Sequence, residues 1–162
     1  MKNRTNLLQT CNNETNIIKY FIRYKFVSNK PDFFFKFYFM TKYNELELQL
    51  LNVQIGCMLR LARLKKNLSQ HDLALLLGYT STMIGRVERF ENVSSWDKIF
   101  SISKQLNVIF CNLFVLQNQE KLLSIVNESY KLEKKLTQEK EDYYSFLKKS
   151  IVTKYNLLEN EK

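Results

Sequence analysis

The chain has 162 residues, of which 45% are hydrophobic and 25% are charged. This length and composition are enough to bury one modest core and do not fit a disordered chain. The 25 Lys and Arg residues exceed the 16 Asp and Glu residues, and the net charge of +9 favours a polyanion or an anionic membrane surface as partner.

Glycine and proline are scarce, with three and one respectively, and none follows Gly85. Because these residues interrupt helices most strongly, we expect an all-α chain. The cysteines at 11, 57 and 111 lie far apart and include no CxxC pair, so neither a disulfide framework nor a zinc site is predicted. His71 has no nucleophile or ligand cluster beside it. We therefore expect no metal, no cofactor and no enzymatic activity, in a reducing cytoplasm.

Residues 1–39 are rich in clustered aromatic residues and show no helical or strand period. Charged residues interrupt each apolar run, so neither a signal peptide nor a membrane-spanning helix is predicted. Phe, Asn, Lys, Tyr and Ile, whose codons are rich in A and T, supply 24 of these residues. We expect a poorly ordered or spurious extension, with Met40 as the start of the folded unit. The alternative is a basic aromatic segment that lies on a membrane surface.

The middle of the chain changes to short amphipathic helices separated by stop signals. Apolar residues recur at helical spacing from Ile55, and the first helix is expected to end near Asn67, which tolerates the left-handed conformation. Ser69 is a good N-cap for a second helix over 70–77, which Gly78 would close.

Three further helices are expected before residue 116. Thr80 or Ser81 can cap a third helix that reaches Arg89, and Ser94 or Ser95 can cap a fourth. A short fifth helix follows. Four aromatic residues of the last two helices are expected in the core because they lie at helical spacing with other apolar residues: Trp96, Phe100, Phe110 and Phe114.

The chain after residue 116 is strongly helix-forming and carries two apolar stripes. The first consists of Leu122, Ile125, Val126, Leu132 and Leu136, and the second of Tyr143, Leu147, Ile151, Tyr155 and Leu158. Either these stripes pair two chains as a coiled-coil arm, or they fold back on their own domain as a helical hairpin. We thus expect a domain over 40–116 and a helical extension over 117–162.

The third helix has two distinct arcs at about 100° per residue. Met83, Ile84, Val87 and Glu88 fall on one arc, and Ser81, Thr82, Gly85, Arg86 and Arg89 fall on the other. The second arc is expected to face outward. Its short hydrogen-bonding groups and guanidinium groups suit a base-pair edge or a phosphate, and the alternative is a solvated surface.

Four stretches in register carry a more specific signal: IG at Ile55, LSQHDLALLLG from Leu68, TSTMIGRVE from Thr80 and LNVIFCNLF from Leu106. Over residues 55–114 the chain resembles the XRE-like helix-turn-helix family of phage Cro and repressor proteins. The resemblance implies a five-helix DNA-binding domain whose third helix lies in the major groove of DNA.

Site residues follow from this resemblance position by position. Gln70 matches a phosphate-binding glutamine, and Arg63 and Glu88 match an ion pair between the first and third helices. Phe90 stands where relatives commonly have glycine, which weakens the case for a left-handed cap there. The candidate DNA-binding residues are Gln70, Thr80, Ser81, Thr82, Gly85, Arg86 and Arg89.

The sequence therefore predicts a cytoplasmic protein that binds double-stranded DNA sequence-specifically. We expect a prokaryotic or phage-type transcriptional regulator, acting as a homodimer, without a membrane contact or a small-molecule effector. An antitoxin and a restriction-system controller are alternatives of the same kind. A helical interaction protein or membrane-surface protein is the alternative of a different class.

Overall fold

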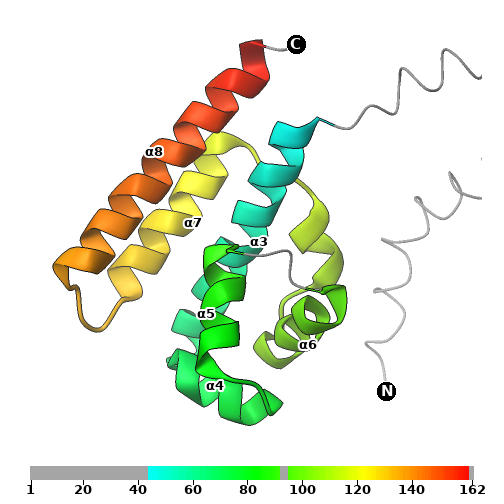
Figure 1. Cartoon of the computed structure of the whole chain (residues 1–162), viewed down its shortest axis with the longest axis vertical. Coiled ribbons are helices and arrows are strands. Elements are labelled where there is room, and N and C mark those ends of the chain that lie inside the picture. Colours follow the sequence, from blue (N-terminus) through cyan, green and yellow to red (C-terminus); the bar gives the residue numbers. More distant parts are fainter. Residues whose placement is uncertain (1–43, 92–94, 161–162) are drawn as a thin grey trace, which may run out of the picture. The chain divides into compact units, whose positions relative to one another are not determined.

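The computed structural model describes residues 44–91 and 95–160, which belong to one compact unit. Its regular elements are all helices, so the all-α expectation is confirmed for these residues (Figure 1). The expectations for residues 1–39 and for Ser94 lie outside them. In chain order the helices are α3 (Glu45–Lys65), α4 (Gln70–Leu77), α5 (Ser81–Arg89), α6 (Trp96–Leu106), the 3₁₀ helix η1 (Phe110–Phe114), α7 (Gln119–Leu132) and α8 (Gln138–Asn160).

Helix α3 begins ten residues before Ile55, where the sequence pattern first indicated a helix. The Asn44 side chain accepts a hydrogen bond from the Leu46 amide at 2.8 Å and caps the helix. Glu45 and Glu47 in the first turn also favour this start, because negative charge is stabilised at a helix N-terminus. Beyond the C-terminus, Asn67 adopts the expected left-handed conformation with φ of 62°.

Helices α4 and α5 begin and end where the sequence predicts. The Ser69 hydroxyl accepts from the Asp72 amide at 3.0 Å, and the Asp72 carboxylate accepts from the Ser69 amide at 2.8 Å, which forms a capping box. Gly78 closes α4 in the left-handed region, with φ of 67°. Thr80 then caps α5 by accepting from the Met83 amide. The two helices are consequently separated by a tight turn of three residues.

The left-handed cap of α5 forms although the residue is not glycine. Phe90 has φ of 50°, and the amide of Glu91 donates to the Arg86 carbonyl at 3.1 Å. The Phe90 ring is held beside Gly56 of α3, where an added Cβ would lie 3.0 Å from the ring and 2.8 Å from the Glu88 carbonyl oxygen. Gly56 therefore permits the close approach of α3 to the end of α5.

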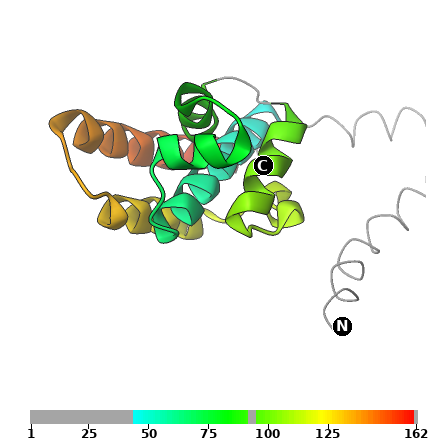
Figure 2. The same ribbon diagram turned by 90° about the horizontal axis from the view of Figure 1, so that it is seen from below.

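Helix α3 is buried on two opposite faces. One face packs Ile55 and Leu59 into a core with α4, α5, α6 and η1, and the other packs Leu50, Val53 and Cys57 into a core with α7 and α8. Figures 1 and 2 show the α7–α8 hairpin on one side of α3 and α6 on the other. Two small cores therefore share one central helix.

The extension after residue 116 is a helical hairpin that folds back on α3, and not an extended arm. Residues from both apolar stripes are buried against α3, whereas Leu132 and Leu136, near the hairpin turn, remain 39% and 45% exposed. The buried members are Leu122, Ile125 and Val126 of α7 and Leu147, Ile151, Tyr155 and Leu158 of α8.

A buried glutamine fixes the link between the two cores. The Gln54 amide donates to the carbonyls of Leu113 and Val115 at 3.1 and 2.9 Å, and its oxygen accepts from the Gln117 amide at 2.7 Å. The Tyr155 hydroxyl donates to the Gln117 carbonyl from the other side. Because Gln54 is completely buried, these bonds satisfy polar groups that would otherwise be costly to bury.

The aromatic residues of α6 and η1 do not lie in the core as expected. Trp96 is 70% exposed, Phe100 39% and Phe114 43%, and only Phe110 is partly buried against the core with α4 and α5. The physical reason is that α6 buries a narrow stripe made of Ile102, Ser103 and Leu106. The adjacent apolar stripe of α6 has the same helical period, but its Phe100 ring meets the edge of the Phe110 ring of η1 and stays 39% exposed.

We predict that Ile151→Ala lowers the free energy of unfolding by about 2–5 kcal/mol, because it deletes a fully buried side chain between α8 and α3. Leu157→Ala on the same helix is the control, since Leu157 is 47% exposed. Urea unfolding of both variants measures the difference. Equal small losses would mean that the hairpin does not pack on α3.

Candidate nucleic-acid interface

The exposed face of α5 presents three of the predicted DNA-binding side chains. Ser81, Thr82 and Arg86 are all exposed, and within the described ranges the Arg86 guanidinium group makes no hydrogen bond or close ion pair, although its charge helps to lower the pKa of Glu91. Thr80 is exposed too, but its hydroxyl oxygen already accepts the capping bond from the Met83 amide at 3.2 Å. The face therefore offers two hydroxyls and one guanidinium group to a ligand.

The opposite face of α5 places a buried carboxylate against α3. Arg63 donates to Glu88 through Nε at 2.5 Å and through Nη2 at 2.9 Å. Its Nη1 donates to the Leu68 carbonyl at 2.7 Å. The structure thus brings Arg63 and Glu88 together in a two-pronged pair, with side chains only 6% and 2% exposed.

Gln70 lies at the first position of α4 and is turned toward this carboxylate. Its Nε2 donates to Glu88 Oε2 at 2.8 Å, so the predicted phosphate-binding side chain is also part of the buried network. The second N–H of the amide has no hydrogen-bond partner among the described residues. Glu88 therefore fixes the orientation of the Gln70 amide as well as that of Arg63.

Gly85 does not face outward, which corrects the expectation from the helical arcs. It is buried, and a Cβ there would lie 3.0 Å from Arg89 Nη1 and 3.3 Å from Gln70 Oε1. The arc assignment fails here because the side chains of Gln70 and Arg89 close over this point of α5. Gly85 consequently gives space to the side chains of Gln70 and Arg89.

Arg89 is only partly exposed and forms an ion pair with Glu91. Arg89 Nε donates to Glu91 Oε1 at 2.6 Å. The hydrogen bond with Arg89 lowers the pKa of Glu91, and the same bond raises the pKa of Arg89. An incoming phosphate would therefore compete with the Glu91 carboxylate for this guanidinium group.

A second buried arginine, Arg60, was not singled out in the sequence. It is 6% exposed, and its Nε lies 3.5 Å from Glu88 Oε2. Its guanidinium carbon lies 4.6 Å above the Tyr143 ring and 5.7 Å from the Tyr144 ring, both on α8. Burial acts to lower the pKa of Arg60, but Tyr143 and Glu88 together raise it above its ordinary value. The sequence feature that could have identified Arg60 is its three-residue spacing from Arg63, which places both arginines on one side of α3.

The positive charge of the chain is unevenly divided. Residues 1–43 hold eight Lys and Arg against two acidic residues, so they account for two thirds of the net charge of +9.

Lys65 and Lys66, at the end of α3, are engaged within the fold. Lys65 pairs with Glu128 at 2.8 Å, and Lys66 donates to the Gln105 carbonyl at 2.8 Å. Arg86 is thus the cation best placed on the exposed face of α5.

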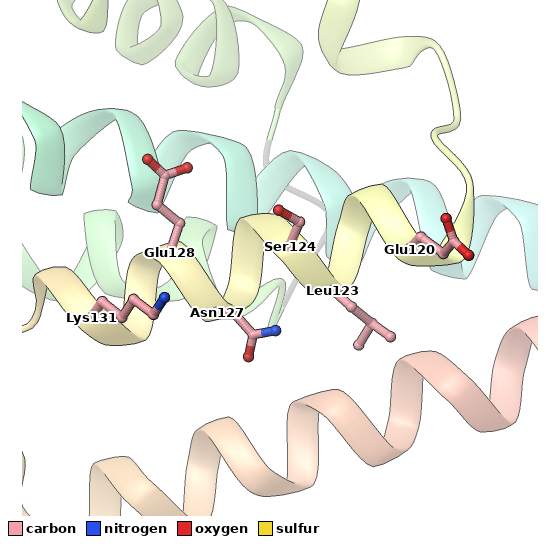
Figure 3. Close-up of a pocket in the computed structure, with 6 residues that line it drawn as sticks. All are labelled: Glu120, Leu123, Ser124, Asn127, Glu128 and Lys131. Carbon is pink, nitrogen blue, oxygen red and sulfur yellow. The ribbon is translucent and has the colours of Figure 1, made fainter.

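Other surfaces of the described residues offer less. An open hollow of about 470 Å³ runs along α7, as Figure 3 shows, and six residues of that helix line it: Glu120, Leu123, Ser124, Asn127, Glu128 and Lys131. No group of three His, Cys, Asp or Glu residues in the described ranges could hold a metal ion. Nor is any helix in these ranges long and apolar enough to cross a membrane.

Comparisons with known proteins assign the chain to no family. No family model matches the chain, and no match was found among curated proteins or among solved structures.

We predict that Glu88→Gln lowers the free energy of unfolding by about 3–5 kcal/mol, because Arg60 and Arg63 would keep buried charges without a carboxylate. Glu91→Gln should cost less than about 1 kcal/mol, since its pair with Arg89 is 37% and 47% exposed. Thermal unfolding of the two variants at one pH provides the comparison. A small effect of Glu88→Gln would show that the carboxylate is not central to the fold.

Proposed function

We propose that the protein binds double-stranded DNA sequence-specifically and regulates transcription, with α3 to η1 as a five-helix repressor-type helix-turn-helix domain. The observation that carries the proposal is the exposed face of α5, where Ser81, Thr82 and Arg86 project from a helix that is fixed to α3 through Glu88. A rigid helix with short polar groups and one unengaged guanidinium group suits the major groove.

The α4–α5 pair supports a helix-turn-helix assignment. Two short helices pack together across a three-residue turn that begins with a left-handed glycine, Gly78, as in helix-turn-helix motifs. The first helix of such a motif crosses the DNA backbone, and the second enters the groove. On this proposal α4 contacts phosphates and α5 reads base edges.

Gln70 is the candidate phosphate contact of α4. Glu88 holds one N–H of its amide, which leaves the other N–H and the amides of the first helical turn for an oxygen of the DNA backbone. Arg89 would contribute a second phosphate contact by exchanging Glu91 for the phosphate. The Thr80 hydroxyl accepts the capping bond from the Met83 amide and can still donate its O–H to a phosphate oxygen.

The proposed setting is the cytoplasm of a prokaryote or a phage-infected cell, without an effector. An antitoxin or a restriction-system controller would use the same face of α5 for its operator. Titration with duplex DNA and with anionic vesicles, at matched salt, separates DNA binding from the membrane-surface class. Binding to vesicles with no binding to selected duplexes would refute the proposal.

We predict that Arg86→Ala relaxes the preference for one base pair in each half-site, by about 1–3 kcal/mol, while other positions keep their preference. Duplexes selected from a random pool by the full chain define the sites, and binding to single-base variants measures the loss. Lys149→Ala is the control, because Lys149 is equally exposed but lies on α8. If Arg86→Ala weakens all duplexes by the same factor, Arg86 binds phosphate and reads no base.

A further inference from the structure

An exposed row of aromatic side chains runs across α6 and η1. The rings of Phe100 and Phe110 meet edge to face at 5.2 Å between centroids, and those of Phe110 and Phe114 at 4.9 Å. Trp96 extends the row, since it lies one helical turn before Phe100 on the same side of α6. We call these four residues the aromatic row.

The aromatic row differs from the scattered apolar residues that any surface carries. Trp96, Phe100 and Phe114 are 70%, 39% and 43% exposed, the last two are joined through the Phe110 ring, and Trp96 follows at helical spacing. Contiguous exposed aromatic groups mark interaction sites, because aromatic residues dominate the energetics of interfaces. The row lies on the side of α3 away from the hairpin, so α7 and α8 do not cover it (Figure 2).

The charges that border the row point to a second copy as the occupant. The exposed Asp97 lies in the first turn of α6 and the exposed Lys104 in its last turn. At 100° per residue, Trp96, Phe100 and Lys104 follow one another along a stripe about 80° wide, and Asp97 lies about 20° beyond Lys104. One edge of the stripe is therefore acidic at its start and basic at its end.

Such a stripe is complementary to itself when two α6 helices lie antiparallel. A two-fold axis near Phe100 would place Trp96 of each copy beside Lys104 of the other, because both lie four residues from Phe100. Asp97 would then face the same ammonium group. Lys104 Nζ already lies 5.7 Å from the Phe100 ring centroid of its own chain, so each Lys104 gains an opposite charge and a second aromatic face, and the two Phe100 rings meet at the axis.

We propose that two copies of this chain associate through the aromatic row, with their α6 helices antiparallel about Phe100. The interface replaces the one expected from the stripes of the hairpin, which are used within the chain. The proposal does not rest on DNA binding, because association is measured without DNA.

Sedimentation equilibrium of the full chain over micromolar concentrations tests the proposal. We expect a dimer, and we expect Phe100→Lys to weaken association by about tenfold or more, because two like charges would meet at the axis. Phe146→Lys is the control, since Phe146 is 72% exposed on α8, away from the row. A monomeric full chain, or a dimer that Phe100→Lys leaves intact, would overturn the proposal.

Charge reversal tests the antiparallel arrangement without replacing any residue of the aromatic row. Asp97→Lys and Lys104→Asp should each weaken association, and the double variant should restore it, because each reversed charge again faces its opposite. Circular dichroism confirms that each variant keeps its helices. If the double variant associates no better than the single variants, the antiparallel arrangement is wrong.

Trp96 supplies an independent readout, because it is the only tryptophan in the chain. Its emission should shift to shorter wavelength as the concentration of the full chain rises, and Phe100→Lys should abolish that dependence. An emission that is shifted at all concentrations in a monomeric chain would mean that another segment of the same chain covers the row. That result would overturn the proposal of a second copy.

Discussion

The buried carboxylate of Glu88 is the interaction on which the arrangement of the helices depends. It accepts from Arg63 on α3 and from Gln70 on α4, and it lies 3.5 Å from Arg60. One residue of α5 therefore fixes the positions of two other helices. The cost of burying three charges is offset by the two-pronged geometry with Arg63 and by the tyrosine rings beside Arg60. The exposed face of α5 is consequently presented at a defined angle to α4.

The same network connects that face to the C-terminal hairpin. Arg60 lies between Glu88 of α5 and the rings of Tyr143 and Tyr144 of α8. Its guanidinium group therefore contacts both helices. Gln54 and Tyr155 add a second link through the Gln117 backbone. The hairpin is therefore a structural part of the proposed DNA-binding unit, and a loss of its packing should disturb α5 through Arg60.

Local signals in the sequence predicted where the helices begin and end. Contacts between residues far apart in the sequence decide which side chains are buried, and these contacts could not be predicted. The ends of α4 and α5 were predictable because Ser69, Gly78 and Thr80 act on the backbone within three residues of themselves. Gly85 was misplaced because two side chains fold over it, Gln70 from α4 and Arg89 from the last turn of α5, and the helical period shows neither. Trp96 was misplaced because helical spacing shows that a stripe is apolar but not whether another element packs on it. Helix α3 begins earlier than predicted because Asn44 caps it and two glutamates occupy its first turn, and the apolar pattern alone does not contain this signal.

The packing of the hairpin on α3 and the exposure of the aromatic row are connected, because both follow from which apolar surfaces the chain buries. Helix α3 is covered on both faces, and the hairpin stripes supply one of these covers, so they are not available for pairing two chains. The aromatic row of α6 and η1 is an apolar surface that this arrangement leaves exposed, on a helix that packs beside α4. A two-fold axis through α6 would place the two α5 helices of a dimer in equivalent positions, as reading two symmetric half-sites of DNA requires. The folding back of the hairpin and the exposure of Trp96 thus belong to one arrangement, in which the proposed association and the proposed DNA reading use helices of the same core.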